Sequence, residues 1–173
     1  MIENLNKKIL VVDDEDDVRI YLSNALIDAG FVVSTASDGF IALEALKKEI
    51  PDLISLDLVM PKHSGLKFYR DVQKHKLWKT IPVLIVTGHA KDDLGKVDFD
   101  TMMMQGPGVY LEKPVKPAKY IETVCKILKI DPGEYVDSLK KTDPAKLREE
   151  LSKSLNGADV ESLQKALDAL KKK

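Results

Sequence analysis

Five polar residues of this 173-residue chain lie at the ends of short apolar runs. Asp13 and Asp14 close the run KKILVVDD, Asp57 lies near the end of PDLISLDLVMP, Thr87 closes PVLIVT and Lys113 follows YLE. If these runs are neighbouring parallel strands, all five side chains lie at the same edge of one sheet. A buried carboxylate costs several kcal/mol unless a positive group compensates it. The pattern therefore predicts an acidic site that also holds a lysine.

The charges of this predicted site indicate which chemistry it could perform. Carboxylates in close contact repel by about 4 kcal/mol per pair at an effective dielectric constant near 20. Lys113 supplies one positive charge, and a divalent cation would supply the rest; an all-oxygen ligand set favours Mg²⁺. An ionised Asp57 is then a nucleophile, and phosphorus is its natural electrophile, because Lys113 and Mg²⁺ neutralise phosphoryl oxygens. Thr87 could donate a hydrogen bond to a further phosphoryl oxygen.

The elements that must position these residues alternate along the chain. Apolar runs predict strands, and apolar residues at helical spacing predict the helices between them. The strands are expected over 7–12, 31–36, 52–58, 81–88 and 110–114, and the helices over 15–30, 41–49, 66–78, around 101–105 and over 118–130. This alternation predicts an α/β fold, with a five-stranded, doubly wound parallel sheet covered by helices on both faces.

The chain changes character after Ile130. Residues 131–173 contain no strand pattern, and two leucine-rich stripes at helical spacing predict a helical hairpin. Asp143 and Asp159 are the expected N-caps, and Gly157 is the expected end of the first helix. We therefore expect a domain over residues 1–130 and a helical extension over 131–173 that dimerises or docks on a partner.

Composition excludes several classes of protein. The formal net charge is −1, so the chain has no overall electrostatic bias toward nucleic acid or anionic membranes. No apolar run approaches the roughly 18 residues of a membrane span, and the N-terminus lacks a secretory pattern. The single cysteine, Cys125, is expected to be a small buried hydrophobe. These observations predict a cytoplasmic protein that does not bind membranes.

Four motifs make residues 7–130 resemble the receiver domain of two-component response regulators. They are ILVVDDE, DLISLDLVMPKHSGL, PVLIVTG and VYLEKP, and they occur in the family's order. The resemblance implies a flavodoxin-like sheet of order 2-1-3-4-5. It also implies that Asp57 accepts a phosphoryl group from a phosphohistidine on a sensor histidine kinase or phosphotransfer protein.

The resemblance further implies roles for the neighbours of Asp57. Asp14 would ligate Mg²⁺ directly, Asp13 mostly through water, and the backbone carbonyl of Val59 would be a further ligand. Thr87 and Tyr110 match the family's switch pair, in which the aromatic ring follows the threonine inward after phosphorylation. The peptide bond before Pro114 is expected to be cis.

Some positions depart from the family pattern or need another reading. The usual Asp-Gly pair is replaced by Ser64-Gly65, and the segment from Thr87 to Lys113 is longer than usual. Val59 replaces the polar residue that helps water attack in some relatives, which predicts slow self-dephosphorylation. The acidic run 15–17 is expected to be a solvated first helical turn, with Glu15 as its one candidate for a supporting role at the site.

Three classes of function remain open at this point. The favoured one is a phosphorylation-switched signalling protein that acts through protein–protein contacts, without DNA binding and without enzymatic activity beyond its own phosphorylation and dephosphorylation. The second is a transcriptional regulator with a minimal output segment; the nine basic and nine acidic residues of 131–173 argue against DNA binding. The third is a phosphoaspartyl phosphatase, which would require an aspartate at the position of Val59. The kinase, the stimulus and the downstream target are not encoded in any pattern of the sequence.

Overall fold

The computed structural model describes residues 6–61, 64–88 and 109–133. Its centre is a five-stranded sheet of order β2-β1-β3-β4-β5, and every neighbouring pair of strands is parallel. The strands are β1 (Lys8–Val12), β2 (Val32–Ala36), β3 (Leu53–Leu56), β4 (Val83–Thr87) and β5 (Tyr110–Glu112). Both the predicted fold class and the predicted strand order are confirmed.

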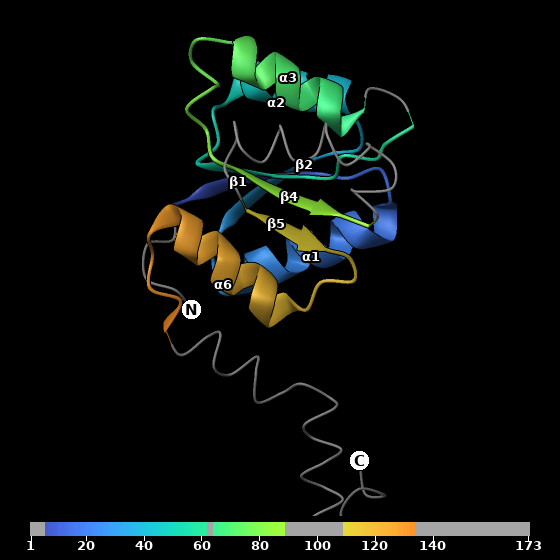
Figure 1. Ribbon diagram of the computed structural model, residues 1–173. Coiled ribbons are helices and arrows are strands. Elements are labelled where there is room, and N and C mark those ends of the chain that lie inside the picture. The colour runs from blue at the N-terminus through green and yellow to red at the C-terminus, as the bar shows by residue number, and fades with distance from the viewer. Residues whose placement is uncertain (1–5, 62–63, 89–108, 134–173) are drawn as a thin grey trace, which may run out of the picture. The chain divides into compact units, whose positions relative to one another are not determined.

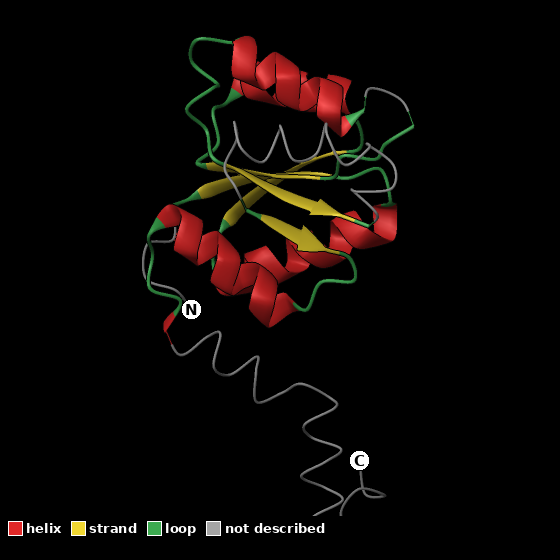
Figure 2. Cartoon of the chain, in the orientation of Figure 1, coloured by secondary structure: helices red, strands yellow, loops and turns green. Residues whose placement is uncertain are grey.

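Helices cover the two faces of the sheet (Figure 1). One face carries α1 (Asp16–Ala29) and α6 (Pro117–Leu128), and the other carries α2 (Gly39–Lys48) and α3 (Gly65–Lys74). Figure 2 shows this three-layer order, with helices above and below the strands. The central strands β3 and β4 are buried at every position, as strands covered on both faces should be.

Local chemistry explains where several helices begin and end. Gly30 ends α1 with φ near 100°, a left-handed conformation that costs glycine little. Asp38 caps α2 by accepting hydrogen bonds from the backbone N–H groups of Phe40 and Ile41, both at 2.9 Å. Because this cap lies earlier than the apolar pattern suggested, α2 begins at Gly39 rather than at residue 41.

The predicted helix over 66–78 is too long at its C-terminal end. The observed α3 ends at Lys74, and His75 takes an extended backbone conformation. The ring of His75 stacks on Trp78 with centroids 3.7 Å apart, and its Nδ1 atom accepts a hydrogen bond from the backbone of Leu77. These contacts favour a compact turn over another helical turn, and they bury Trp78 against the core.

A partly exposed ion pair joins Lys7, just before β1, to Asp52, just before β3. Burial by itself would raise the pKa of Asp52. Hydrogen bonds from Lys7 Nζ at 2.7 Å and from the Lys8 backbone N–H at 2.8 Å outweigh this effect, so the pKa of Asp52 lies below its ordinary value. A depressed carboxyl pKa gives stability that is present above the unfolded-state pKa and lost as the pH falls through the folded-state value.

Asp52→Asn is therefore expected to lower the free energy of unfolding by about 1 kcal/mol at pH 7. The deficit should shrink as the pH falls from the unfolded-state value of about 4 through the lower folded-state value, where the wild-type carboxyl also becomes neutral. Urea denaturation at several pH values measures both effects. Asp28→Asn, at an exposed position of α1, is the matched control and should change little at any pH; a deficit for Asp52→Asn that is equal at pH 3 and pH 7 would contradict the assignment.

Two predicted elements lie outside the described residues. The chain divides into two compact units, residues 1–136 and 137–173, and the second unit belongs wholly to the part that is not described. The predicted helical hairpin and the predicted helix around 101–105 therefore stay predictions. Among the described residues, no helix has the length and apolarity needed to cross a bilayer.

Candidate functional site

Three carboxylates meet at the edge of the sheet where β1 and β3 end. Each of Asp13, Asp14 and Asp57 offers one oxygen, and these oxygens all lie within 4.8 Å of one another. Asp13 and Asp57 are almost fully buried, with 1% and 4% of their surface exposed, and Asp14 is partly exposed. The acidic cluster expected from the sequence is therefore present.

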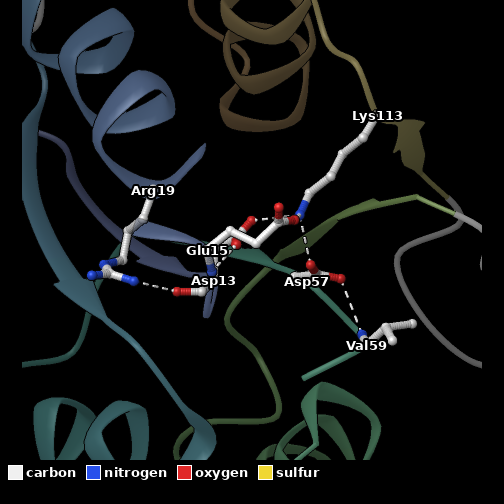
Figure 3. A network of polar contacts seen from close by, with 6 residues as sticks. All are labelled: Asp13, Glu15, Arg19, Asp57, Val59 and Lys113. Carbon is white, nitrogen blue, oxygen red and sulfur yellow. Dashed lines mark hydrogen bonds and ion pairs between the residues drawn. The ribbon is translucent and has the colours of Figure 1, made fainter. Parts of the chain in front are cut away.

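The ammonium group of Lys113 lies among the carboxylates of Asp13, Glu15 and Asp57 (Figure 3). Its Nζ atom is 2.7 Å from Asp57 Oδ2, 2.9 Å from Asp13 Oδ2 and 3.1 Å from Glu15 Oε1. Burial by itself would lower the pKa of Lys113, but the hydrogen bonds and charges of Asp57 and Asp13 outweigh burial and raise this pKa above its ordinary value. Lys113 is therefore a permanent positive charge at the site.

One ammonium group does not compensate three clustered carboxylates. Burial raises the pKa of Asp13 even though Lys113 lies beside it, because burial makes the ionised form costly. Asp13 Oδ2 forms an ion pair with Lys113 but accepts no hydrogen bond of good geometry from the described residues. A hard divalent cation bound by oxygen atoms fits this donor set, so the cluster could hold one.

Backbone contacts hold the loop that carries the acidic pair. Asp13 Oδ1 accepts a hydrogen bond from the backbone N–H of Glu15 at 2.9 Å. The carbonyl oxygen of Asp13 accepts another from Arg19 Nη1 at 2.7 Å, and Arg19 also pairs with Asp16. Figure 3 shows Arg19 reaching from α1 to the end of β1. The position of Asp13 is thus fixed from both its side chain and its backbone.

The carboxylate of Asp57 is held from two directions. Its Oδ2 atom accepts a hydrogen bond from Lys113, and its Oδ1 atom accepts one from the backbone N–H of Val59 at 3.0 Å. The backbone N–H of Asp57 continues the sheet by donating to the carbonyl of Val12 at 2.9 Å. The predicted role of the Val59 carbonyl as a metal ligand stays a prediction.

Thr87 and Tyr110, the predicted switch pair, lie on the neighbouring strands β4 and β5. Thr87 is 1% exposed, and its hydroxyl has no hydrogen-bond partner among the described residues. Its carbonyl accepts a hydrogen bond from the backbone N–H of Lys113 at 3.0 Å. Tyr110 pairs in register with Ile85 and is 39% exposed. A buried hydroxyl without a partner is a hydrogen-bond donor that an incoming oxygen atom could use.

Gly65 is packed directly against the backbone of the phosphoacceptor candidate. A Cβ atom at this position would lie 1.8 Å from the carbonyl oxygen of Asp57 and 2.7 Å from the Cα atom of Leu58. Both neighbours are backbone atoms, so neither can move without displacing the end of β3. The glycine of the Ser64-Gly65 pair is therefore required by space, whereas Ser64 caps α3 by accepting a hydrogen bond from the Lys67 backbone N–H.

Gly65→Ala is expected to destabilise the fold by about 1–3 kcal/mol or more, because overpacking against backbone must shift α3 or β3. Urea denaturation measures this loss. The matched control is Gly88→Ala, because a Cβ atom there would meet nothing within 4 Å. A Gly65→Ala protein as stable as the Gly88→Ala protein would show that the contact relaxes without cost.

Sequence reasoning missed part of this site. Glu15 was expected mainly as a solvated first-turn acid, and Arg19 was not singled out. The contact of Glu15 with Lys113 joins residues 98 positions apart, so no local pattern indicates it; Arg19 lies only six positions from Asp13, and its contact depends on the turn between β1 and α1. The Lys113–Pro114 peptide bond is cis, as predicted.

Comparison with known proteins agrees with this geometry. A family model described as the response regulator receiver domain matches residues 9–125. The alkaline phosphatase synthesis transcriptional regulatory protein PhoP of Bacillus subtilis (strain 168) is 39% identical over 127 residues, which cover 72% of this chain and 50% of that protein. The chain thus spans about half the length of the transcriptional regulators that it matches.

Solved structures show the same likeness. A putative response regulator from Chloroflexus aurantiacus matches with a TM-score of 0.63 and 31% identity, covering 72% of this chain and 98% of that one. The chemotaxis response regulator CheY4 of Vibrio cholerae matches with a TM-score of 0.59 and 32% identity, covering 70% and 98%. With the acidic cluster, its lysine and the sheet order in agreement, the chain belongs to the response regulator receiver domain family.

Proposed function

We propose that this chain is a phosphorylation-switched response regulator in which Asp57 accepts a phosphoryl group from a phosphohistidine of a sensor histidine kinase or phosphotransfer protein. One observation carries the proposal: the buried Asp57 carboxylate lies 2.7 Å from the Lys113 ammonium and beside two further carboxylates. An oxygen of Asp57 attacks phosphorus, the phosphorus–nitrogen bond breaks, and the imidazole leaves with a proton. Asp57 then carries an acyl phosphate.

The residues of the acidic cluster would hold Mg²⁺. Asp13, Asp14 and Asp57 supply carboxylate oxygens, and the Val59 backbone carbonyl is the proposed further ligand. When bound, Mg²⁺ supplies charge neutralisation for the phosphoryl oxygens. Lys113 would bind one of these oxygens as well. Together these contacts would orient the phosphoryl group for attack by Asp57.

The same site would convert phosphorylation into a change of surface. The Thr87 hydroxyl, which is buried and has no partner among the described residues, would donate to the new phosphoryl oxygen. Movement of Thr87 toward the phosphoryl group would leave space behind it. The half-exposed ring of Tyr110, which lies two register positions away on β5, would then move into this space. In this proposal the protein transmits the signal by a changed protein-binding face. It acts in the cytoplasm, and its only covalent chemistry is its own phosphorylation and dephosphorylation.

Acetyl phosphate provides a direct test, because it transfers a phosphoryl group without a partner protein. The purified chain is incubated with acetyl phosphate and Mg²⁺, and intact-protein mass spectrometry follows the gain of one phosphoryl group. A parallel incubation with EDTA should show no gain. A wild-type protein that gains no phosphoryl group with Mg²⁺ would overturn the proposal.

The output has two candidate forms. We favour dimerisation or partner docking through residues 131–173, because their nine basic and nine acidic residues give no net positive charge that would favour DNA binding. Transcriptional control is the second candidate, and the similarity to transcriptional regulators such as PhoP favours it. Size-exclusion chromatography with and without acetyl phosphate tests the first form. Binding to mixed-sequence DNA at low salt would support the second.

A further inference from the structure

The ammonium group of Lys113 uses three carboxylate contacts, and they are not equivalent. Two partners, Asp13 and Asp57, are buried, and their side chains are 2% and 5% exposed. The third partner, Glu15, has a side chain that is 62% exposed, and its contact at 3.1 Å is the longest of the three. Lys113 donates hydrogen bonds to Asp57 Oδ2 and to Glu15 Oε1, whereas its contact with Asp13 Oδ2 is an ion pair without good hydrogen-bond geometry.

A phosphoryl oxygen that binds Lys113 must compete with these three carboxylates for the ammonium group. The contacts to Asp13 and Asp57 are short and buried, whereas the Glu15 carboxylate can exchange Lys113 for water at little cost. Glu15 and Lys113 also line the same open cavity of about 430 Å³, together with Gly88 and Pro114. Of the three contacts, that of Glu15 therefore lies on the solvent side of the site.

Glu15 also changes the net charge of the site. Among the described residues, the carboxylates of Asp13, Glu15 and Asp57 contact the Lys113 ammonium, and the carboxylate of Asp14 lies close to those of Asp13 and Asp57. A bound divalent cation would leave one negative charge, which is the charge that Glu15 contributes. The nearby guanidinium of Arg19 does not cancel it, because Arg19 is paired with Asp16. Phosphodonors are anions, so this remaining charge opposes their approach.

From these observations we infer that Glu15 is a positioning residue that occupies the phosphoryl-binding donor of Lys113 in the resting protein and slows capture of anionic phosphodonors. This inference rests on the proposed function of Asp57. During transfer from acetyl phosphate, the Asp57 oxygen forms the new bond to phosphorus, the bond from phosphorus to the acetate oxygen breaks, and acetate leaves with the electron pair. A phosphoryl oxygen takes the place of Glu15 on Lys113, and Glu15 turns to solvent.

Substitution of Glu15 should leave the fold intact. Glu15 is the N-cap residue of α1, but its side chain makes no capping hydrogen bond. The hydrogen bond from its backbone N–H to Asp13 Oδ1 does not depend on its side chain. Asp17→Asn is a matched control, because it removes the same charge from an exposed acid in the same helical turn.

The experiment compares wild type, Glu15→Gln, Glu15→Ala and Asp17→Asn. Initial rates of phosphoryl gain are measured by intact mass over a range of acetyl phosphate concentrations, with Mg²⁺, at low salt and at about 0.5 M salt. Both Glu15 variants should show a second-order rate constant about threefold to tenfold above wild type at low salt, chiefly through a lower half-saturating donor concentration. The advantage should shrink at high salt, where exposed charges are screened. Asp17→Asn should stay close to wild type.

Two failures are distinguishable. If wild type gains no phosphoryl group, the proposed function itself is wrong. If wild type is phosphorylated but Glu15→Gln and Glu15→Ala match Asp17→Asn in rate and salt dependence, the inference about Glu15 is overturned and the function of Asp57 stands. A Glu15 variant that is slower than wild type would likewise overturn the inference, because it would show that Glu15 assists capture.

Discussion

Asp57→Asn is expected to abolish phosphoryl gain from acetyl phosphate, by at least about a thousandfold in rate, because an amide lacks the nucleophilic carboxylate oxygen. The amide has the same shape and can still accept the hydrogen bond from the Val59 backbone N–H. Lys113 keeps its contacts with Asp13 and Glu15, so its ammonium group stays in the site. Intact mass after incubation with acetyl phosphate and Mg²⁺ measures the effect.

Asp28→Asn is the control for this substitution. It makes the same chemical change at an exposed position of α1, and it should be phosphorylated like wild type. Urea denaturation shows whether both variants are folded under the assay conditions. A folded Asp57→Asn protein that gains a phosphoryl group at a rate near wild type would place the phosphoacceptor elsewhere.

Lys113→Met is expected to lower the free energy of unfolding by about 3–5 kcal/mol in metal-free buffer, because it leaves Asp13 and Asp57 buried without their cation. Mg²⁺ should restore part of this stability, since a bound dication would again compensate both carboxylates. Burial already raises the pKa of Asp13. A raised carboxyl pKa means that ionisation costs stability as the pH rises through it, so the deficit should be larger at neutral than at acidic pH.

Urea denaturation in EDTA and in Mg²⁺ measures both parts of this prediction. Lys119→Met is the matched control, because Lys119 is 64% exposed and its contact with Glu122 is 4.0 Å long. This control should change stability by less than about 1 kcal/mol, and Mg²⁺ should not affect the difference. Equal stability of the two variants in EDTA would mean that the buried acids are compensated by something other than Lys113.

The sequence by itself was enough to predict the frame of the site. Continuous apolar runs such as LISL and VLIVT indicate strands buried on both faces, and such strands run parallel between crossover helices. Parallel strands end at one edge, so residues that follow them must meet there. This pattern predicts that Asp13, Asp57 and Lys113 lie together, and they do.

Tertiary structure alone decided the finer contacts. Three of them are the contact of Glu15 with Lys113, the hydrogen bond from Arg19 to the Asp13 carbonyl and the packing of Gly65 on the Asp57 backbone. The end of α3 at Lys74 is a further feature that periodicity does not give, because the stack of His75 on Trp78 favours a turn over another helical turn. Periodicity determines which face an element buries, since this depends on neighbours in the chain. Which long side chain reaches a distant cation depends on the path of loops and on rotamers, and these are fixed only when the layers pack together.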